Sequence, residues 1–304
     1  MAHIRVGTRS SALALAQTDL VADLLQRAGH TVDIVTMQTR GDQVLDRSLN
    51  QIGSKGVFTE ELEQALLSDR VDLAVHSLKD LPTELPPGLV VGAYTFPSDR
   101  RDVLLTDGAT LRNMKPGTRL GTSSVRRTAF IRAIRPDVVL VPVRGNLKTR
   151  IDKWRSGDFD GLVLAAAGVL RLGWEHLITE YLDPGVITPS PGQGVLAVEV
   201  AQHRRDLREL MAQINDVRAQ IVAVAERAVL DEVGGGCQIP LGAYGEWRSD
   251  TTLSLLAQVA GLDGTPVIKK AVTCSAREAE QAGRIIGCYL REHGARELIQ
   301  TQEG

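Results

Sequence analysis

Segments typical of strands and of helices alternate along most of this sequence, and that alternation restricts the fold more than any other feature. Ser10 or Ser11 is placed to cap the first helix, and Gly29 is placed to end it. Strands that alternate with helices are typical of parallel sheets, so an α/β lobe is predicted. In this lobe the apolar spacing predicts strands at residues 4–8, 32–39, 73–76 and 89–94 and helices ending at residues 28 and 68.

A second series of the same kind begins near Asp102 and predicts a second α/β lobe. A further apolar strand at 195–200 lies too far along the chain to belong simply to this series, so it is interpreted as a return to the first sheet. Such a return predicts a two-lobed protein with a cleft. The second series consists of strands at residues 103–105, 119–121, 138–143 and 161–165 and helices at 125–134 and 147–156.

The pattern changes in the last third of the chain, where a small α+β domain is predicted. A helix at 219–233 precedes a predicted hairpin with strands at 253–260 and 267–273. A capping box formed by Ser275 and Glu278 opens the last helix. The predicted apolar face of that helix consists of Ala279, Ala282, Ile285, Ile286, Tyr289 and Leu290.

Composition excludes two broad classes of protein. Hydrophobic residues make up 43% and charged residues 24% of the 304 residues, which argues against disorder. The longest uncharged apolar stretch, residues 161–170, is about half as long as a membrane span requires, so no membrane association is expected. The apolar run at 12–16 is too short for a secretory signal, and a cytoplasmic protein is predicted.

The cysteines and histidines form no pattern typical of a metal site. Cys237, Cys274 and Cys288 are an odd number without a CxxC spacing. The six histidines contain no pair four residues apart and no HExxH motif. Neither a metal site nor a disulfide framework is predicted.

Positive charge gathers in one window of the chain. Residues 124–172 hold ten Lys and Arg against four Asp, a net charge of +6, so the remainder carries −8 of the total of −2. A basic region inside a mildly acidic protein indicates an anionic ligand that is held locally, whereas a protein that binds duplex nucleic acid usually has a larger basic face. Nucleic acid is therefore not expected as a partner.

The segment from Gly121 to Arg127 joins a predicted strand to a predicted helix. Backbone N–H groups, the hydroxyl of Ser124 and the guanidiniums of Arg126 and Arg127 converge there, which predicts an anion site. The competing interpretation is a capped surface helix that needs no ligand. Because open α/β sheets bind ligands at the carboxyl ends of their strands, Arg144, Arg150 and Arg171 are predicted to join the same site.

Lys79 and Asp80 follow a buried strand within the segment His76 to Pro82. Two interpretations fit this pattern equally well. The pair is a structural ion pair, or Asp80 lies in a cleft as a general acid, a general base or a stabiliser of cationic intermediates.

Two glycine-rich segments complete the set of candidates. The segment from Gly53 to Phe58 lacks the GxxxxGK[ST] pattern of a P-loop and is interpreted as a mobile lid. Cys237 follows three glycines. An isolated cysteine is usually a small buried hydrophobe, yet the unusual backbone access makes Cys237 the candidate nucleophile.

Seven motifs, in this order, closely resemble those of the porphobilinogen deaminase family. Several independent motifs in the right order are far more specific than any one alone, and the resemblance runs nearly from end to end of the chain. Gly53-Ser54, where family members often have two glycines, is a minor variation. The motifs are Arg9-Ser10-Ser11, Gly53 to Phe58, His76 to Pro82, Gly121 to Arg127, Arg144-Gly145-Asn146, Ser190 to Gly194 and Gly235 to Pro240.

The resemblance implies a transferase of tetrapyrrole (haem) biosynthesis. Such an enzyme joins four porphobilinogen molecules head to tail, releases ammonia each time and yields hydroxymethylbilane after hydrolytic release. It also implies a dipyrromethane cofactor, held through a thioether by Cys237, that the enzyme builds from its own substrate as a primer. Each pyrrole carries two carboxylates, which agrees with the basic window at residues 124–172.

By the same resemblance Asp80 is the catalytic carboxylate. It helps to protonate the leaving amine, stabilises the positively charged intermediate and assists loss of the pyrrole α-proton. The implied cofactor binders, besides Cys237, are Ser11, Lys79, Asp80, Ser124, Arg126, Arg127, Arg144 and Arg150. The implied substrate binders are Arg9, Ser11, Arg144, Arg150, Arg171, Gln193, Phe58 and, as a weaker lid candidate, Lys55.

The implied fold has two α/β lobes like those of periplasmic binding proteins, joined by crossing hinge strands, and a small α+β third domain. The first lobe is expected at residues 1–96 and 194–212, the second at 100–189, and the domain with the cofactor cysteine at 217–304. A monomer is expected.

Two other functional classes stay open at this point. A non-catalytic module that binds a carboxylated small molecule has the same two-lobed outline, although the missing export signal and the Gly-Gly-Gly-Cys sequence argue against it. An unrelated enzyme with a cysteine nucleophile needs a histidine partner, and His76 is the only histidine near a motif.

Overall fold

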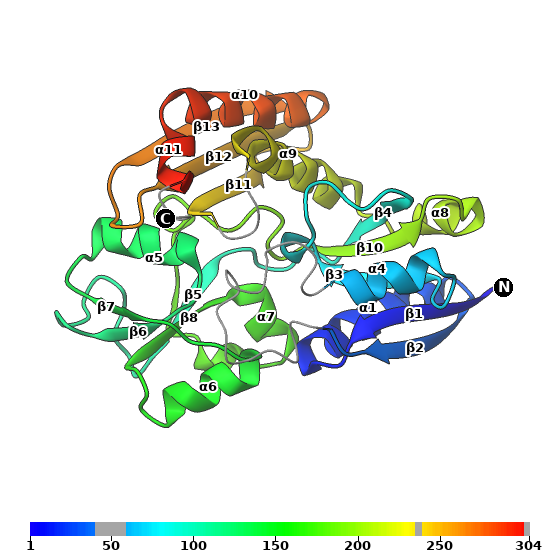
Figure 1. Ribbon diagram of the computed structural model, residues 1–304, viewed down its shortest axis with the longest axis horizontal. Coiled ribbons are helices and arrows are strands. Elements are labelled where there is room, and N and C mark those ends of the chain that lie inside the picture. The colour runs from blue at the N-terminus through cyan, green and yellow to red at the C-terminus, as the bar shows by residue number, and fades with distance from the viewer. Residues whose placement is uncertain (40–58, 235–238, 301–304) are drawn as a thin grey trace. The chain divides into compact units, whose positions relative to one another are not determined.

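The computed structural model describes residues 1–39, 59–234 and 239–300. The chain folds into two compact units. The first contains Met1–Ser98 and Gly194–Gln220, and the second contains Asp99–Gln193 and Ile221–Gly304. Figure 1 shows the elements that make up each unit. The boundaries predicted for three domains stay a prediction, because the division into two compact units does not test them.

The first unit is built on a five-stranded sheet with the strand order β2-β1-β3-β10-β4. β1 lies parallel to β2 and β3, but β10 runs antiparallel to both of its neighbours, β3 and β4. The predicted return of the chain to the first sheet is confirmed, whereas the expected parallel pairing holds for β1, β2 and β3 but not for β10. β10 enters the sheet from a segment outside this unit rather than through a helical crossover, so nothing forces parallel pairing. The strands are β1 (His3–Arg9), β2 (Thr31–Met37), β3 (Leu73–Ser77), β4 (Leu89–Thr95) and β10 (Leu196–Ala201).

Helices cover both faces of this sheet. Leu73 and Val75 of β3 pack in one cluster with residues of α1 and α8, whereas Ala74, between them in sequence, packs in another cluster with Leu62 of α4. Alternate residues of a strand point to opposite faces, so the two clusters lie on opposite sides of the sheet. The helices are α1 (Ala12–Arg27), α4 (Glu60–Leu67) and α8 (Arg205–Met211), and the short helix η1 (Leu78–Asp80) follows β3.

The second unit contains two sheets, of which the first has the strand order β7-β6-β8-β5-β9. β6 is parallel to β7 and β8, and β5 is antiparallel to β8 and β9. The predicted elements at 119–121, 125–134 and 161–165 have the observed bounds. The elements are β5 (Asp102–Thr106), β6 (Arg119–Gly121), α5 (Val125–Ile134), β7 (Val139–Val141), α6 (Leu147–Arg155), β8 (Gly161–Ala165), α7 (Ala166–Arg171), η2 (Glu175–Leu177) and β9 (Glu180–Tyr181).

The other sheet of the second unit is a three-stranded antiparallel meander with helices packed against it. The capping box of Ser275 and Glu278 is confirmed. Ile285 is exposed, contrary to prediction, and Gly283 lies on the buried face instead. A Cβ at Gly283 would meet the carbonyl oxygen of Ala225 at 2.2 Å, so this glycine permits the close approach of α9 and α10. The elements are α9 (Val217–Val233), β11 (Leu241–Trp247), β12 (Thr252–Ala260), β13 (Val267–Ser275), η3 (Ala276–Glu278), α10 (Ala279–Glu292) and α11 (Ala295–Gln300).

Overall, the predicted class of α/β lobes with a smaller α+β part is confirmed. Within the described ranges, no helix is both long enough and apolar enough to cross a membrane. The same ranges hold no cluster of three or more His, Cys, Asp or Glu that could bind a metal ion.

Candidate active site

Four of the predicted site residues gather at one edge of the first unit's sheet. β1 and β3 are parallel neighbours, so their carboxyl ends lie at the same edge. Arg9 ends β1 and Ser11 follows it, while Lys79 and Asp80 belong to η1, directly after β3. We call these four residues the Asp80 edge.

Local contacts fix the backbone of the Asp80 edge. The Ser11 hydroxyl accepts a hydrogen bond from the backbone N–H of Ala14 and thereby caps α1, as predicted. The Gln17 amide of α1 donates to the Ser77 hydroxyl over 2.9 Å and so ties that helix to the end of β3.

Asp80 itself is presented to solvent by a turn whose flanks are anchored in the core. Leu78 and Leu81 on either side of the Lys79-Asp80 pair are fully buried, and the backbone N–H of Leu78 donates to the carbonyl of Val195. Asp80 is exposed, so its carboxylate is available to a ligand without any loss of packing.

Three titratable side chains lie buried behind this edge, on the face of the sheet that α4 covers. His76 Nε2 is 3.2 Å from Glu199 Oε2, close enough for an ion pair although the two are not aligned as a hydrogen bond. Glu63 of α4 belongs to the same group. Burial raises the pKa of its carboxyl, and the nearby carboxylates of Glu199 and Glu60 add to the rise, although the neighbouring Thr59 and His76 act against it. This cluster was not predicted from the sequence.

The raised pKa of Glu63 predicts a pH-dependent stability. The folded protein holds the Glu63 proton at pH values where the unfolded chain has already released it, so this stabilising effect is complete below the ordinary pKa of glutamate and is lost as the pH rises through the raised value. We expect Glu63→Gln to match the parent melting temperature near about pH 4 and to exceed it near about pH 8. Thermal unfolding across this range, with the exposed Glu84→Gln as control, checks the prediction. An unchanged pH slope in Glu63→Gln would contradict it.

The remaining described candidates, apart from Gln193, follow the strands of the first sheet in the second unit. β6, β7 and β8 are parallel, so the segments after them lie at one edge. The Ser123 hydroxyl binds both the carbonyl and the N–H of Val143, at 2.6 and 2.9 Å, and so joins the segments that follow β6 and β7. We call the following set the arginine edge: Ser124, Arg126, Arg127, Arg144, Arg150 and Arg171.

Ser124 caps α5, as the competing interpretation of this segment predicted, since its hydroxyl accepts a hydrogen bond from the N–H of Arg127. Arg126 and Arg127 occupy the first turn of this helix, but both side chains are buried and both bind one carboxylate, that of Asp102. Burial alone would raise the pKa of Asp102, yet the charges of Arg126 and Arg127 outweigh it and hold the pKa well below its usual range. The sequence interpretation did not include Asp102; the available signal was an acidic residue at the start of an otherwise apolar strand.

Three further arginines differ in how they are held. Nη1 of Arg144 is enclosed by the protein but makes no hydrogen bond within the described ranges. Nε of Arg150 donates to the carbonyl of Gly145 over 2.8 Å, which directs the side chain back toward the segment that contains Arg144. Burial lowers the pKa of Arg171 to about 10, so this side chain is still positively charged at neutral pH.

Gln193 is buried, and the structure directs its amide toward the protein. Nε2 of Gln193 donates to the carbonyls of Arg100 and Arg101 and to Oδ1 of Asp102, the last over 2.9 Å. Its predicted contact with substrate stays a prediction. The predicted sites at Lys55, Phe58 and Cys237 lie outside the described residues.

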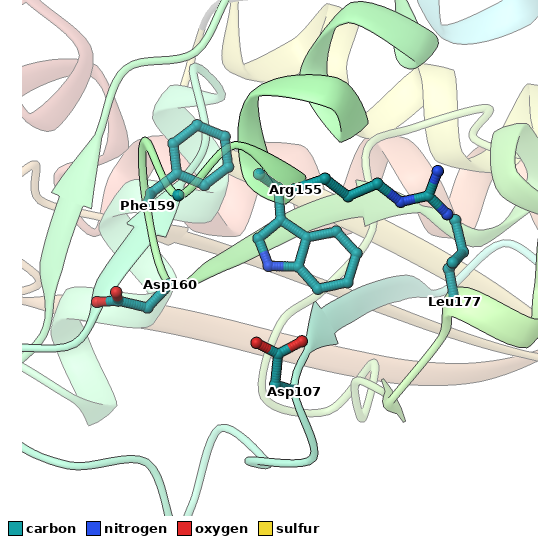
Figure 2. A pocket seen from close by; sticks show the side chains of 7 residues that line it. Asp107, Arg155, Phe159, Asp160 and Leu177 are labelled. Atoms are coloured by element: carbon teal, nitrogen blue, oxygen red, sulfur yellow. The ribbon is translucent and has the colours of Figure 1, made fainter.

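A separate pocket of about 420 Å³ lies at the other end of the same sheet. Asp107 follows the last residue of β5, and Phe159 and Asp160 precede β8, so the pocket opens where β8 begins rather than where it ends (Figure 2). None of the predicted site residues that the structure describes lines it. The side chains of Arg155 and Leu177 complete the rim that Figure 2 shows.

Comparison with known proteins identifies the family of this chain. Residues 4–209 match the family described as "Porphobilinogen deaminase, dipyromethane cofactor binding domain", and residues 221–292 match "Porphobilinogen deaminase, C-terminal domain". The chain belongs to the porphobilinogen deaminase family. The predicted transferase activity, in which four porphobilinogen molecules become hydroxymethylbilane, and the predicted dipyrromethane cofactor are thereby confirmed.

Curated relatives agree over the full length of the chain. The porphobilinogen deaminase of Syntrophomonas wolfei is 43% identical over 307 residues and covers 100% of both chains. Those of Geobacillus kaustophilus and Desulfitobacterium hafniense are 42% and 44% identical, and each alignment covers 99% of this chain and 97% of the relative. Full-length agreement of this kind does not support the alternative of a binding module without catalytic activity.

Among solved structures, the substrate-binding domain of a putative molybdenum transporter from Clostridium difficile aligns with 73% of this chain and 96% of its own. The TM-score is 0.44 and the identity is 11%. A likeness this weak carries no argument about the ligand.

Proposed function

We propose that this chain performs the reaction of its family through the Asp80 edge of the first unit and the arginine edge of the second. In this proposal the arginine edge binds the carboxylates of the cofactor and of the growing pyrrole chain. The Asp80 edge moves protons and binds the incoming porphobilinogen. Phe58 and Lys55 are proposed as further substrate contacts on the basis of the resemblance alone.

The observation that carries the proposal is an excess of buried positive charge. One carboxylate, Asp102, faces two buried guanidiniums, and the nearby Arg144 has an enclosed Nη1 with donor capacity left over. Buried charges and buried donors are costly unless they are paired. The carboxylates of a pyrrole chain would supply the missing partners, because arginine binds a carboxylate through two parallel hydrogen bonds.

Asp80 is proposed as the catalytic residue. As a carboxylic acid it would give a proton to the leaving amine of porphobilinogen, and as a carboxylate it would stabilise the positive charge that follows. The same carboxylate would then accept the α-proton that the attacking pyrrole loses. Arg9 and Lys79, beside it at the same edge, would hold a substrate carboxylate and so orient the amine toward Asp80.

Residues of this chain fit the cofactor that the family requires. When bound at Cys237, the dipyrromethane group supplies the pyrrole position at which the chain is extended. Ser124, Arg126, Arg127 and Arg144 would hold its carboxylates.

Substitution of Arg144 tests this assignment. We expect Arg144→Met to raise the KM for porphobilinogen by roughly tenfold or more, measured as the release of ammonia. The substitution replaces the buried hydrogen-bond donor with an apolar group of similar length. Arg155→Met is the control, since Arg155 lies at the opposite end of the same sheet. Ammonia release by the parent protein tests the function itself. An unchanged KM in an Arg144→Met protein that is active would remove Arg144 from the site.

We also propose that the chain acts in the cytoplasm as a monomer. The first statement rests on the membership of this chain in the family. The second rests on the expectation from the family.

A further inference from the structure

Asp102 connects more of the arginine edge than any other side chain that the structure describes. Its Oδ2 accepts from Nη1 of Arg126 over 2.7 Å, and its Oδ1 accepts from Nη2 and Nε of Arg127 over 2.8 and 3.1 Å. Gln193 adds a third donor to Oδ1. Both oxygens of one carboxylate are therefore committed to holding two neighbouring guanidiniums.

Two backbone carbonyls complete the geometry of the arginine pair. Nη1 of Arg126 also donates to the carbonyl of Thr188 over 2.6 Å, and Nη1 of Arg127 donates to the carbonyl of Val163 over 3.0 Å. Each guanidinium is thus fixed at two points, by Asp102 and by one carbonyl. For Arg126 the hydrogen bonds within the described ranges use only Nη1, so the N–H groups of Nε and Nη2 are available to a ligand.

The charge of this group is not balanced. Asp102 is fully buried, and the side chains of Arg126 and Arg127 are 5% and 7% exposed. Two positive charges face one negative charge, so one positive charge is left in a place that water reaches poorly. An added carboxylate would be attracted strongly there, since screening by solvent is weak.

A second aspartate of the same chain shows how a purely structural group differs. Asp72, in the first unit, also binds two arginines, Arg5 and Arg204, each over 3.0 Å. There no positive charge is left over, because Arg204 also pairs with Asp206 over 2.8 Å and with Asp69 over 3.9 Å. Both arginine side chains are also more exposed, at 38% and 27%. The Asp72 group thus has no unpaired positive charge to offer to a ligand, whereas the Asp102 group has one.

We propose that Asp102 is a positioning residue for the arginine edge. It orients Arg126 and Arg127 and, by cancelling only one of their two charges, leaves one positive charge for one carboxylate of the pyrrole chain. This inference rests on the proposed function of the arginine edge. In addition, Asp102 holds Arg126 and Arg127 in place without itself contacting the ligand.

The test is cofactor loading, measured as the intact mass of full-length protein after incubation with porphobilinogen. We expect Asp102→Asn to lower the loaded fraction by roughly tenfold or more, because an amide cannot hold two guanidiniums in place. In Asp102→Asn molecules that do carry the cofactor, the KM for porphobilinogen should rise. Asp72→Asn is the matched control: it also removes a buried carboxylate that binds two arginines, and it should load like the parent protein.

The outcomes separate this inference from the function on which it rests. If the parent protein shows only its polypeptide mass, both as purified and after incubation with porphobilinogen, the proposed function fails. If the parent and Asp102→Asn load equally while both are folded by circular dichroism, the positioning role fails. If Asp102→Asn does not fold, Asp102→Glu carries the test, since it keeps the charge and displaces the carboxylate by one methylene. Asp102→Glu should fold and load poorly, and loading equal to that of the parent would overturn the inference.

Discussion

Replacing Asp80 with asparagine is expected to lower turnover by roughly 10²- to 10⁴-fold while the protein still folds and still carries its cofactor. The change removes the negative charge and the proton-transfer capacity of the side chain but hardly alters its volume. Asp80 is exposed, and the buried Leu78 and Leu81 anchor its turn, so folding should not depend on the carboxylate. Steady-state ammonia release, together with the intact mass of the purified variant, measures both parts of the prediction.

Controls for the Asp80 experiment separate charge from position. Glu84→Gln removes an exposed carboxylate four residues further along the chain and should leave turnover near that of the parent protein. Asp80→Glu keeps the acid but moves it by one methylene and should retain part of the activity. Near-normal turnover of Asp80→Asn would exclude Asp80 as the group that transfers protons.

Replacing Cys237 with serine is expected to remove the covalent cofactor completely. A hydroxyl is a far weaker nucleophile than a thiolate at neutral pH, so no thioether and no equivalent ether should form. The parent protein should exceed its polypeptide mass by two porphobilinogen units less two ammonias, whereas Cys237→Ser should show the polypeptide mass alone. Peptide mapping of the parent should place the added mass on Cys237.

The other two cysteines provide matched controls for this result. Burial raises the pKa of the Cys274 thiol, and burial together with Glu232 raises that of Cys288, so both hold their protons more firmly than a free cysteine. Cys274→Ser and Cys288→Ser should therefore load like the parent protein. An adduct that persists in Cys237→Ser and disappears in one of these two variants would move the attachment site.

Local sequence signals predicted the elements that carry the candidate site. Ser11 and Ser124 cap α1 and α5 as expected, because a hydroxyl at such a position accepts a bond from a backbone N–H three residues on. The segments of the Asp80 edge and of the arginine edge follow strands as predicted. The motif comparison identified the family from the same segments, since the motifs keep their order along the chain.

Contacts between distant residues could not be predicted in this way. The antiparallel entry of β10 and β5 depends on where the chain returns to a sheet, which periodicity along the chain does not report. His76, Glu199 and Glu63 form one buried cluster from three separate elements, and no spacing in the sequence indicates it.

Arg126 and Arg127 show most clearly which properties follow from the sequence and which follow from the tertiary structure. Residue type and spacing determined that Arg126 and Arg127 would stand in the first turn of a helix, next to a strand end where anions bind. Only the tertiary structure decided that both would be buried against Asp102, 24 and 25 residues earlier in the chain. Helix caps and strand patterns arise from neighbours in sequence, whereas burial and charge balance arise from the packing of segments that are far apart in sequence. The charge left over at the arginine edge is therefore a property of the fold.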